Sequence, residues 1–382
     1  MAYFTRILDL RQETRTKSLF LFGPRQTGKT SLLRALFPES PLYNLLLADV
    51  FLRISQRPQI IREELTAYRH TLRQPIVIDE IQKLPILLDE VQYMIDEYGW
   101  RFILTGSSAR KLKRGAANLL GGRLRMRHLF PLVSAEIPHY DLLRFLNYGA
   151  LPPIYTATEP EEDLAAYIGT YLQEEIQAEG AVRKIENFSR FLQVAALTNG
   201  TLLNFSSIAS DAGVPARTVV EYYSLLQDTL VGALLEPYTR TKRRKAIATA
   251  KFYFFDIGVS HHLAGRQHIR PRTELFGNAL EHFLFTELRA YLAYRRDRRP
   301  LHFWRSASGY EVDFLVGDDV AIEVKGTANI VERHLTGLQA LTEEIRMKKK
   351  IVVAMVPLPR VIQGIHILPV ATFLEQLWSD QY

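Results

Sequence analysis

Eight consecutive residues near the start of the chain have the types and spacing that bind phosphate groups. Two glycines in the run let the backbone turn so tightly that successive N–H groups point at one anion. Lys29 is placed to reach the β- and γ-phosphates of a nucleoside triphosphate such as ATP, and the Thr30 hydroxyl to ligate Mg²⁺. The run matches G-x-x-x-x-G-K-[ST] and consists of Gly23, Pro24, Arg25, Gln26, Thr27, Gly28, Lys29 and Thr30, with Ser31 directly after it.

Two adjacent carboxylates, Asp79 and Glu80, follow an apolar stretch that starts at Pro75. The carboxyl ends of parallel strands face the ligand crevice of a sheet, so this pair is expected beside the phosphate loop. We expect Asp79 to hold Mg²⁺, directly or through water, and Glu80 to polarise the attacking water as general base. The alternative is a pair of charges at a helix N-terminus, which the phosphate loop upstream makes the weaker interpretation.

Two further polar positions are candidates for the nucleotide site. Ser107, or failing that Thr105, follows the apolar strand that begins at Arg101 and could orient water against the γ-phosphate. The alternative for Ser107 is an N-cap at a strand-to-helix turn. Arg123 could act as an arginine finger on the nucleotide of a neighbouring subunit. A structural or DNA-facing arginine at this position is equally consistent with the sequence.

A second constellation of reactive residue types lies near the C-terminus. Asp313 lies in one predicted strand, and Glu323 and Lys325 lie two residues apart in the next, so these two share a face. Asp313 and Glu323 would ligate Mg²⁺ or Mn²⁺ for phosphodiester cleavage, and Lys325 would stabilise the anion. Glu281 would complete the metal shell, and Gln339 could contact a substrate. The alternative is that Glu323 and Lys325 form an ion pair at a sheet edge.

The elements that must position these residues can be traced in the sequence. An apolar run at 18–22 predicts a buried strand before the phosphate loop, and an amphipathic helix follows at 31–37, stopped by Pro38. The helix adds its positive N-terminal end to the anion site. A chance glycine-rich turn would not explain both flanks. Further strands are predicted at 43–47, 75–81, 101–105 and 125–129.

These N-terminal motifs together resemble the AAA-type P-loop ATPases of prokaryotes. The resemblance rests on the strand before Asp79-Glu80, on Leu104-Thr105-Gly106-Ser107-Ser108, and on the run from Gly122-Arg123 to Glu136. That run is similar to one subfamily, in which the ATPase is fused to a C-terminal domain of uncharacterised function. The resemblance implies a RecA-like core with the strand order of the additional-strand, catalytic-glutamate class, in a homo-oligomer.

The middle of the chain predicts helices and then a DNA-binding element. A helical pattern at 163–183 is expected to act as a lid or hinge. A helix-turn-helix at 207–226, followed by two strand-like segments with a basic run between them, resembles a winged helix. The alternative is a packing module that does not touch DNA. The candidate DNA contacts are Arg217, Thr218 and Tyr222 on the second helix and Lys242, Arg243 and Arg244 in the wing.

The C-terminal elements follow a recognisable order. A helix at 275–288 precedes three strands, a further helix at 335–345 and a strand at 351–354. This αβββαβ order is that of restriction-endonuclease-like folds, and Asp313 with Glu323 and Lys325 resembles the PD-(D/E)XK signature, with Val312 in place of the proline.

Composition limits the alternatives. The chain has 382 residues, enough for two or three domains, and a formal charge of +7, which is mild for this length. The absence of cysteine excludes disulfides, thiolate zinc sites and cysteine nucleophiles. No apolar run approaches the roughly 20 residues that span a bilayer, and the start lacks a signal-peptide pattern, so we expect a cytoplasmic protein with no membrane contact.

We therefore expect an α/β protein of four segments: an ATPase domain at 1–140, a helical lid or linker at 141–185, a winged helix at 186–265 and a nuclease-like domain at 266–382. The leading hypothesis is an oligomeric ATPase that acts on DNA, in which ATP turnover repositions the nuclease-like domain. The alternative is a nucleotide-gated DNA- or protein-binding switch whose nuclease-like domain is inactive.

Overall fold

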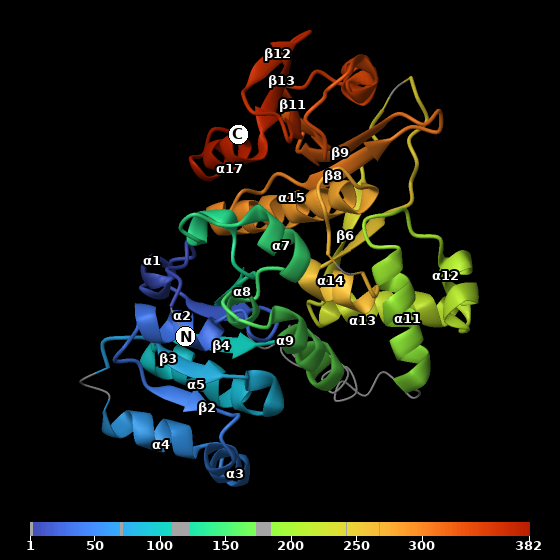
Figure 1. The fold of residues 1–382 in the computed structure, drawn as a ribbon. Coiled ribbons are helices and arrows are strands. Elements are labelled where there is room, and N and C mark those ends of the chain that lie inside the picture. Colours follow the sequence, from blue (N-terminus) through green and yellow to red (C-terminus); the bar gives the residue numbers. More distant parts are fainter. Residues whose placement is uncertain (1–2, 69–71, 109–121, 173–184, 242, 267) are drawn as a thin grey trace. The chain divides into compact units, whose positions relative to one another are not determined.

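The fold is described by a computed structural model that covers residues 3–68, 72–108, 122–172, 185–241, 243–266 and 268–382 (Figure 1). The chain divides into two compact units. Unit 1 comprises Met1–Phe130 with Asp228–Val231, and unit 2 comprises Pro131–Gln227 with Gly232–Tyr382. The sequence predicted four segments, and the predicted limits near 140 and 265 do not coincide with the division between the two units.

Unit 1 is built around a five-stranded parallel sheet in the order β2-β3-β4-β1-β5. Strand β4 lies between β1, which leads into the phosphate loop, and β3, which ends at Asp79. An extra strand in this place defines the additional-strand class, so the predicted strand order is confirmed. The strands are β1 (Ser18–Phe22), β2 (Leu42–Asn44), β3 (Ile76–Asp79), β4 (Phe102–Gly106) and β5 (Leu124–His128).

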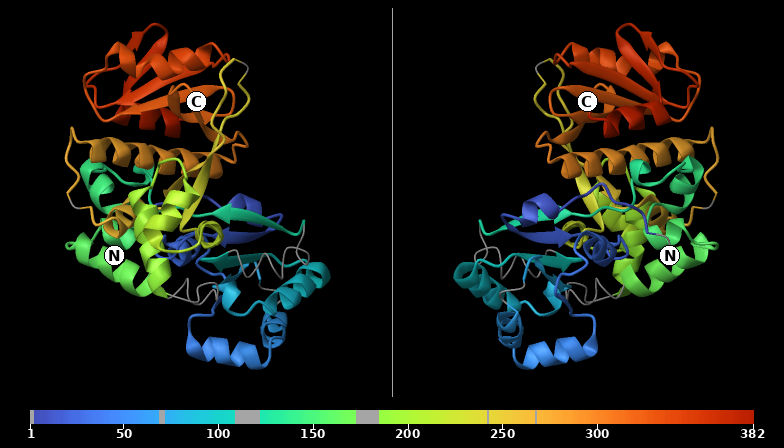
Figure 2. Two further views of the ribbon diagram at one scale, coloured as in Figure 1. Left: turned by 90° about the vertical axis from the view of Figure 1, so that its right-hand side faces the viewer. Right: turned by 90° about the vertical axis from the view of Figure 1, so that its left-hand side faces the viewer.

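Helices of unit 1 bury their apolar faces against this sheet. Strand residues such as Ile78 and Leu104 share one hydrophobic core with Val91 of α5 and Ile54 of α3, all of them almost fully buried. Helices α3 and α4 lie side by side near the edge strand β2 (Figures 1 and 2). The helices are α1 (Arg11–Thr14), α2 (Lys29–Leu36), α3 (Ala48–Gln56), α4 (Ile60–Ala67), α5 (Leu87–Tyr98) and the 3₁₀ turn η1 (Ile81–Lys83).

Unit 2 contains an eight-stranded mixed sheet in the order β12-β13-β11-β10-β9-β8-β6-β7. Strand β6 of the predicted winged helix pairs with β8 of the predicted nuclease-like domain, with Glu236 opposite His302. The predicted limit at 265/266 therefore runs through one continuous sheet. The strands are β6 (Gly232–Pro237), β7 (Lys251–Phe254), β8 (Leu301–Arg305), β9 (Glu311–Val316), β10 (Val320–Lys325), β11 (Lys349–Ala354), β12 (Arg360–Ile362) and β13 (Ile365–Pro369).

The predicted αβββαβ order is confirmed by α15 (Glu274–Arg295), β8, β9, β10, α16 (Thr336–Thr342) and β11. Helix α15 contacts β10 and runs alongside the C-terminal strands, as Figure 2 shows. Its N-terminus is capped by Thr273, whose hydroxyl accepts a hydrogen bond from the N–H of Phe276. The relation to nucleases stays a prediction, because element order alone does not identify a fold family.

Helices precede and follow this sheet along the chain. Both predicted helices of the helix-turn-helix are present, as α12 and α13, and the α12 C-terminus turns through Gly213 in the left-handed conformation. Only part of the predicted helix at 163–183 is described, as α9 and η3. The elements are η2 (Ser134–Glu136), α7 (Leu142–Tyr148), α8 (Pro152–Tyr155), α9 (Pro160–Ala166), η3 (Tyr167–Leu172), α11 (Ile185–Leu197), α12 (Phe205–Ala212), α13 (Ala216–Asp228), α14 (Ile257–Leu263), η4 (Glu332–His334) and α17 (Val370–Trp378).

Among the helices of the described residues, none is both long enough and apolar enough to cross a membrane.

Candidate functional site

The loop between β1 and α2 has the tight backbone that phosphate binding requires. Gly28 (φ +90°) and Gln26 (φ +59°) adopt left-handed conformations. A Cβ at Gly23 would lie 2.4 Å from the main-chain oxygen of Leu129, so only glycine fits there. The Thr27 hydroxyl donates to the carbonyl of Pro24 at 2.8 Å and closes the loop on itself. The sequence therefore folds this segment into a compact concave turn.

Lys29, the first residue of α2, lies within this turn. Its ammonium group is buried and donates hydrogen bonds to the carbonyls of Gly23 at 2.7 Å and Pro24 at 3.1 Å. The N-cap of α2 is Gly28, which has no side chain to cap the first-turn N–H groups. These groups and the buried cation fit a phosphate. Gln26 and Ser31 are exposed, and Arg25 is half-buried.

The two predicted magnesium ligands are in direct contact. Thr30 Oγ1 donates to Asp79 Oδ2 at 2.7 Å, and Thr105 Oγ1 donates to Asp79 Oδ1. Asp79 is almost fully buried at the carboxyl end of β3. The hydroxyl and carboxylate oxygens are the donor set that Mg²⁺ prefers, so the arrangement fits a magnesium ion bound with a nucleotide.

Glu80 is held in an unusual backbone conformation beside this pair. Its φ of +61° lies in the left-handed region, which is rare for a residue with a Cβ and is often found at functional sites. Its main-chain N–H donates to Thr105 Oγ1 at 3.0 Å. Its Oε2 accepts from Gln82 Nε2 and from Ser107 Oγ, the latter at 3.4 Å. The structure thus brings Glu80 and Ser107 together.

Two residues of this network were not the first choices of the sequence reasoning. Thr105 was the second choice after Ser107, yet it links Asp79 and Glu80. Gln82 was not considered, and it bridges Glu80 and Ser107, donating to the latter at 3.1 Å. No sequence pattern marks Gln82 as a site residue, because its contact with Glu80 and Ser107 depends on the left-handed turn at Glu80.

Arg123, the candidate arginine finger, has a partner in its own chain. Its guanidinium bonds to Asp96 at 2.8 Å, and this hydrogen bond lowers the pKa of the Asp96 carboxyl below its usual range. The neighbouring basic residues are paired as well, since Arg125 and Arg127 both contact the buried carboxylate of Glu13. The finger role is untested and stays a prediction.

The C-terminal constellation contains a lysine that the sequence analysis did not identify. Lys251 of β7 is 5% exposed, and its ammonium contacts Glu281 at 3.1 Å and Glu311 at 2.8 Å. Tyr253 also donates to Glu281, at 2.5 Å. Lys325 pairs with Glu323 at 2.5 Å, which confirms that these two share a face. Lysines from two strands therefore contact two of the three carboxylates that were expected to bind metal, Glu281 and Glu323.

The charged side chains in this cluster shift one another's pKa values. Burial would lower the pKa of Lys251, but the charges of Glu281, Tyr253 and Glu311 outweigh it and raise that pKa well above its usual range. Burial raises the pKa of Glu323 to about 7, and its Oε2 has no hydrogen-bond partner within the described part of the chain. Burial and the nearby Glu323 also raise the pKa of Asp313.

The three-carboxylate metal site stays a prediction. Across the described ranges, no three His, Cys, Asp or Glu side chains lie together as metal ligands. Glu281 instead bonds to Lys251 and Tyr253, and one Asp313 oxygen accepts the N–H of Val324 at 2.7 Å. Gln339 is half-buried and donates to Gln363 at 2.5 Å.

The predicted DNA contacts differ in accessibility. The Arg217 side chain is 92% exposed and Thr218 is half-buried, but Tyr222 packs against the ring of Phe188 with centroids 4.9 Å apart. The prediction for Tyr222 is corrected, because its ring belongs to the core of unit 2.

In the predicted wing, Arg244 forms ion pairs with Glu343 at 2.7 Å and Glu344 at 3.2 Å, and its contact with DNA stays a prediction. Arg243 is exposed. Lys242 lies outside the described residues.

Family comparisons agree with the geometry of unit 1. Residues 15–137 match the model of an AAA domain, and residues 139–269 and 276–373 match two domains of unknown function, DUF8612 and DUF4143. Two uncharacterized proteins, from Mycobacterium bovis and Mycobacterium tuberculosis, are each 28% identical over 333 residues, which is 82% of this chain and 71% of theirs. A Walker-type ATPase of Pyrococcus abyssi aligns with a TM-score of 0.45 and 15% identity, over 67% of this chain and 95% of that one.

The match at residues 15–137, together with the phosphate loop and its strand order, indicates an AAA-type P-loop ATPase domain in the N-terminal part of the chain.

Proposed function

We propose that unit 1 binds ATP with Mg²⁺ and hydrolyses it, and that this cycle switches unit 2 between states that bind DNA differently. The observation that carries the ATPase assignment is the network in which Thr30, Asp79, Thr105 and Glu80 are joined by hydrogen bonds next to the buried ammonium group of Lys29.

Each side chain has a distinct task in hydrolysis. Lys29 exchanges its carbonyl contacts for phosphate oxygens and offsets charge on the transferred group. Thr30 and Asp79 would hold Mg²⁺, which when bound would neutralise charge on the phosphates. Glu80 accepts a proton from the attacking water, and Gln82 and Ser107 fix the orientation of its carboxylate.

Phosphate release from the full-length protein tests this assignment, measured with and without Mg²⁺. The Asp79→Asn variant should need a far higher Mg²⁺ concentration for half-maximal rate, because it loses a charged ligand. An unchanged Mg²⁺ dependence in Asp79→Asn would refute the proposed metal ligation.

DNA binding is proposed on the basis of two exposed arginines, Arg217 on α13 and Arg243 between β6 and β7. Exposed guanidinium groups bind phosphates and make affinity dependent on salt. The double variant Arg217→Ala/Arg243→Ala should weaken binding of duplex DNA and reduce the slope of log affinity against log salt. Arg333→Ala, an exposed arginine elsewhere in unit 2, is the matched control. Equal affinity and slope in all three proteins would refute the DNA assignment.

The contacts of Lys251 favour a non-cleaving role for the C-terminal sheet over nuclease action. Its ammonium lies 2.8 Å from Glu311 and 3.1 Å from Glu281, so a cation of the protein already neutralises the acidic side chains. We therefore propose that this sheet binds a partner without cutting it. A panel of linear and branched DNA with Mg²⁺ or Mn²⁺ should remain intact with and without ATP. Cleavage that disappears in Asp313→Asn would overturn this part of the proposal.

A further inference from the structure

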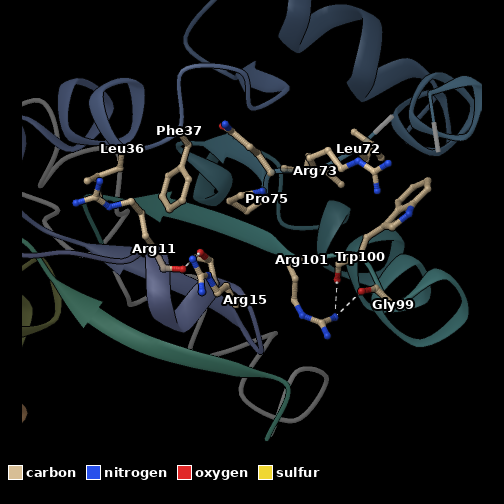
Figure 3. Close-up of a pocket in the computed structure, with 13 residues that line it drawn as sticks. Arg11, Arg15, Leu36, Phe37, Leu72, Arg73, Pro75, Gly99, Trp100 and Arg101 are labelled. Atoms are coloured by element: carbon tan, nitrogen blue, oxygen red, sulfur yellow. Dashed lines mark hydrogen bonds between the residues drawn. The ribbon is translucent and has the colours of Figure 1, made fainter. Parts of the chain in front are cut away.

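Unit 1 contains a pocket at the edge of its sheet opposite the phosphate loop. The phosphate loop follows the carboxyl end of β1, whereas the pocket is formed where β3 and β4 begin and where α2 and α5 end. Its cavity volume is about 510 Å³, which is within the range of small-molecule sites. Figure 3 shows Arg11 and Arg15 on one side of it and Arg73, Arg101 and Trp100 on the other.

Positive charge dominates the lining. Four arginines line the pocket, and no carboxylate does so among the described residues. Asp9 neutralises Arg11 through a two-oxygen contact at 2.9–3.2 Å, which leaves three guanidinium groups. The C-terminal dipoles of α2 and α5 together offset roughly one charge. About two positive charges remain, which matches a phosphate monoester near neutral pH better than a carboxylate.

One donor of this set is left without an acceptor. Arg101 donates from Nη1 to the carbonyls of Gly99 at 2.5 Å and Trp100 at 3.4 Å. Its Nε is buried and has no hydrogen-bond partner within the described ranges. A buried N–H without an acceptor costs about 1–3 kcal/mol, so an oxygen-rich ligand reaching this atom would recover that energy.

The rest of the lining is apolar and partly aromatic. Phe37 is buried at the end of α2. The ring of Trp100 is tilted by 37° against that of Tyr98, with centroids 4.7 Å apart, and Trp100 also lines the pocket. Leu36 and Leu72 add aliphatic surface. A planar ring can pack against these side chains. A phosphate attached to that ring would then bind the guanidinium groups of the pocket.

We propose that this pocket is a second ligand site, distinct from the phosphate loop, and that it binds a nucleoside monophosphate. The phosphate contacts Arg15, Arg73 and Arg101, and the base lies against Trp100 and Phe37. A monophosphate lacks the β- and γ-phosphates that Lys29 recognises, so the two sites select different nucleotides.

Calorimetry of the full-length protein with AMP, GMP, CMP and UMP tests this proposal, with inorganic phosphate as the probe for charge alone. At least one monophosphate should bind more tightly than phosphate does. The Arg15→Ala/Arg73→Ala variant, both of whose changes are at exposed positions, should weaken that binding by at least about tenfold. Arg57→Ala, an exposed arginine of unit 1 outside the pocket, should bind like the wild type.

Three results would overturn the proposal. One is that none of the four monophosphates binds at millimolar concentration. Another is that inorganic phosphate binds as tightly as the tightest-binding monophosphate, which would show that the base does not contribute to binding. The third is loss of binding in Lys29→Ala with full binding in Arg15→Ala/Arg73→Ala, which would assign the ligand to the phosphate loop.

Discussion

Two regions of this molecule bury carboxylates close to lysines, and they use them in different ways. Beside the phosphate loop, Asp79 and Glu80 accept hydrogen bonds from hydroxyl and amide side chains, and Lys29 donates to main-chain carbonyls. In the sheet of unit 2, Lys251 contacts the carboxylates of Glu281 and Glu311 directly. In the first arrangement the carboxylates have neutral partners and can still bind a cationic ligand. In the second, a lysine of the protein already neutralises them.

The comparison shows why a motif of acids and a lysine does not identify a catalytic site on its own. A buried ion pair that is already formed must be broken before either partner can bind a ligand, and breaking it leaves an uncompensated charge. Neutral hydroxyl and amide partners can be displaced at lower cost. The function of each region therefore depends on what the carboxylates contact, which the spacing of residues does not reveal.

The largest effect is expected from Lys29→Ala. Removing the buried ammonium group should lower ATP hydrolysis by roughly a hundredfold or more, because the transferred phosphate loses its cationic partner. Lys83→Ala changes an exposed lysine of unit 1 and should leave the rate unchanged. Phosphate release measured side by side decides the matter, and equal rates in the two variants would contradict the assignment of the site.

Lys251→Met should destabilise unit 2 by about 3–5 kcal/mol, because Glu281 and Glu311 lose their buried counter-charge. Lys348→Met removes an ion pair to Asp319 whose lysine is 78% exposed, and should cost less than about 1 kcal/mol. Urea unfolding of both variants provides the measurement. A Lys251→Met protein as stable as the control would show that the two regions do not differ as described.

A pH-dependent stability difference is expected at His282 of α15. Its ring bonds to the carbonyl of Phe254 at 2.7 Å, and burial lowers its pKa from 6.5 to about 4. The unfolded chain therefore takes up a proton first, and the stability from this group is lost as the pH falls from 6.5 toward 4. Between pH 7 and 5 the wild type should lose about 2 kcal/mol relative to His282→Gln.

Unfolding free energies of the two proteins at both pH values test this, since all other titrations cancel in the difference. A difference that does not change with pH would show that α15 is not packed firmly on β7 beside Lys251.

The smallest effect is expected from Thr105→Val, which removes the hydroxyl that joins Asp79 to the N–H of Glu80. Loss of this buried link should lower the rate of hydrolysis by about tenfold with little change in ATP affinity. Thr66→Val, which removes a hydroxyl bonded to a carbonyl within α4, should leave hydrolysis unaltered. A stronger loss of affinity than of rate would indicate that Thr105 acts on nucleotide binding instead.

Much of the fold could be predicted from local patterns. Strand β1 has the predicted limits, because an apolar run between turn residues determines a strand without reference to the rest of the chain. The arrangement of the strands was less predictable. The pairing of β6 with β8 joins residues more than sixty positions apart, and no local signal marks it.

The phosphate-loop site could be predicted from local patterns, whereas the cluster around Lys251 could not. Lys29 and Thr30 were found because the phosphate loop is a contiguous pattern with a physical reason for each position, and Asp79 because it ends an apolar strand. The role of Lys251 depends on Glu281 and Glu311, which lie 30 and 60 residues further along the chain. Such a contact depends on tertiary packing, which also turned Tyr222 toward the core and paired Arg244 with Glu343.

The measurement that tests the account most directly compares ATP binding with ATP hydrolysis in Glu80→Gln. This substitution keeps the shape of the side chain and removes the base, so nucleotide affinity should stay within about threefold of the wild type while hydrolysis falls by roughly a hundredfold or more. Hydrolysis at the wild-type rate in Glu80→Gln would contradict the proposal that this carboxylate activates water.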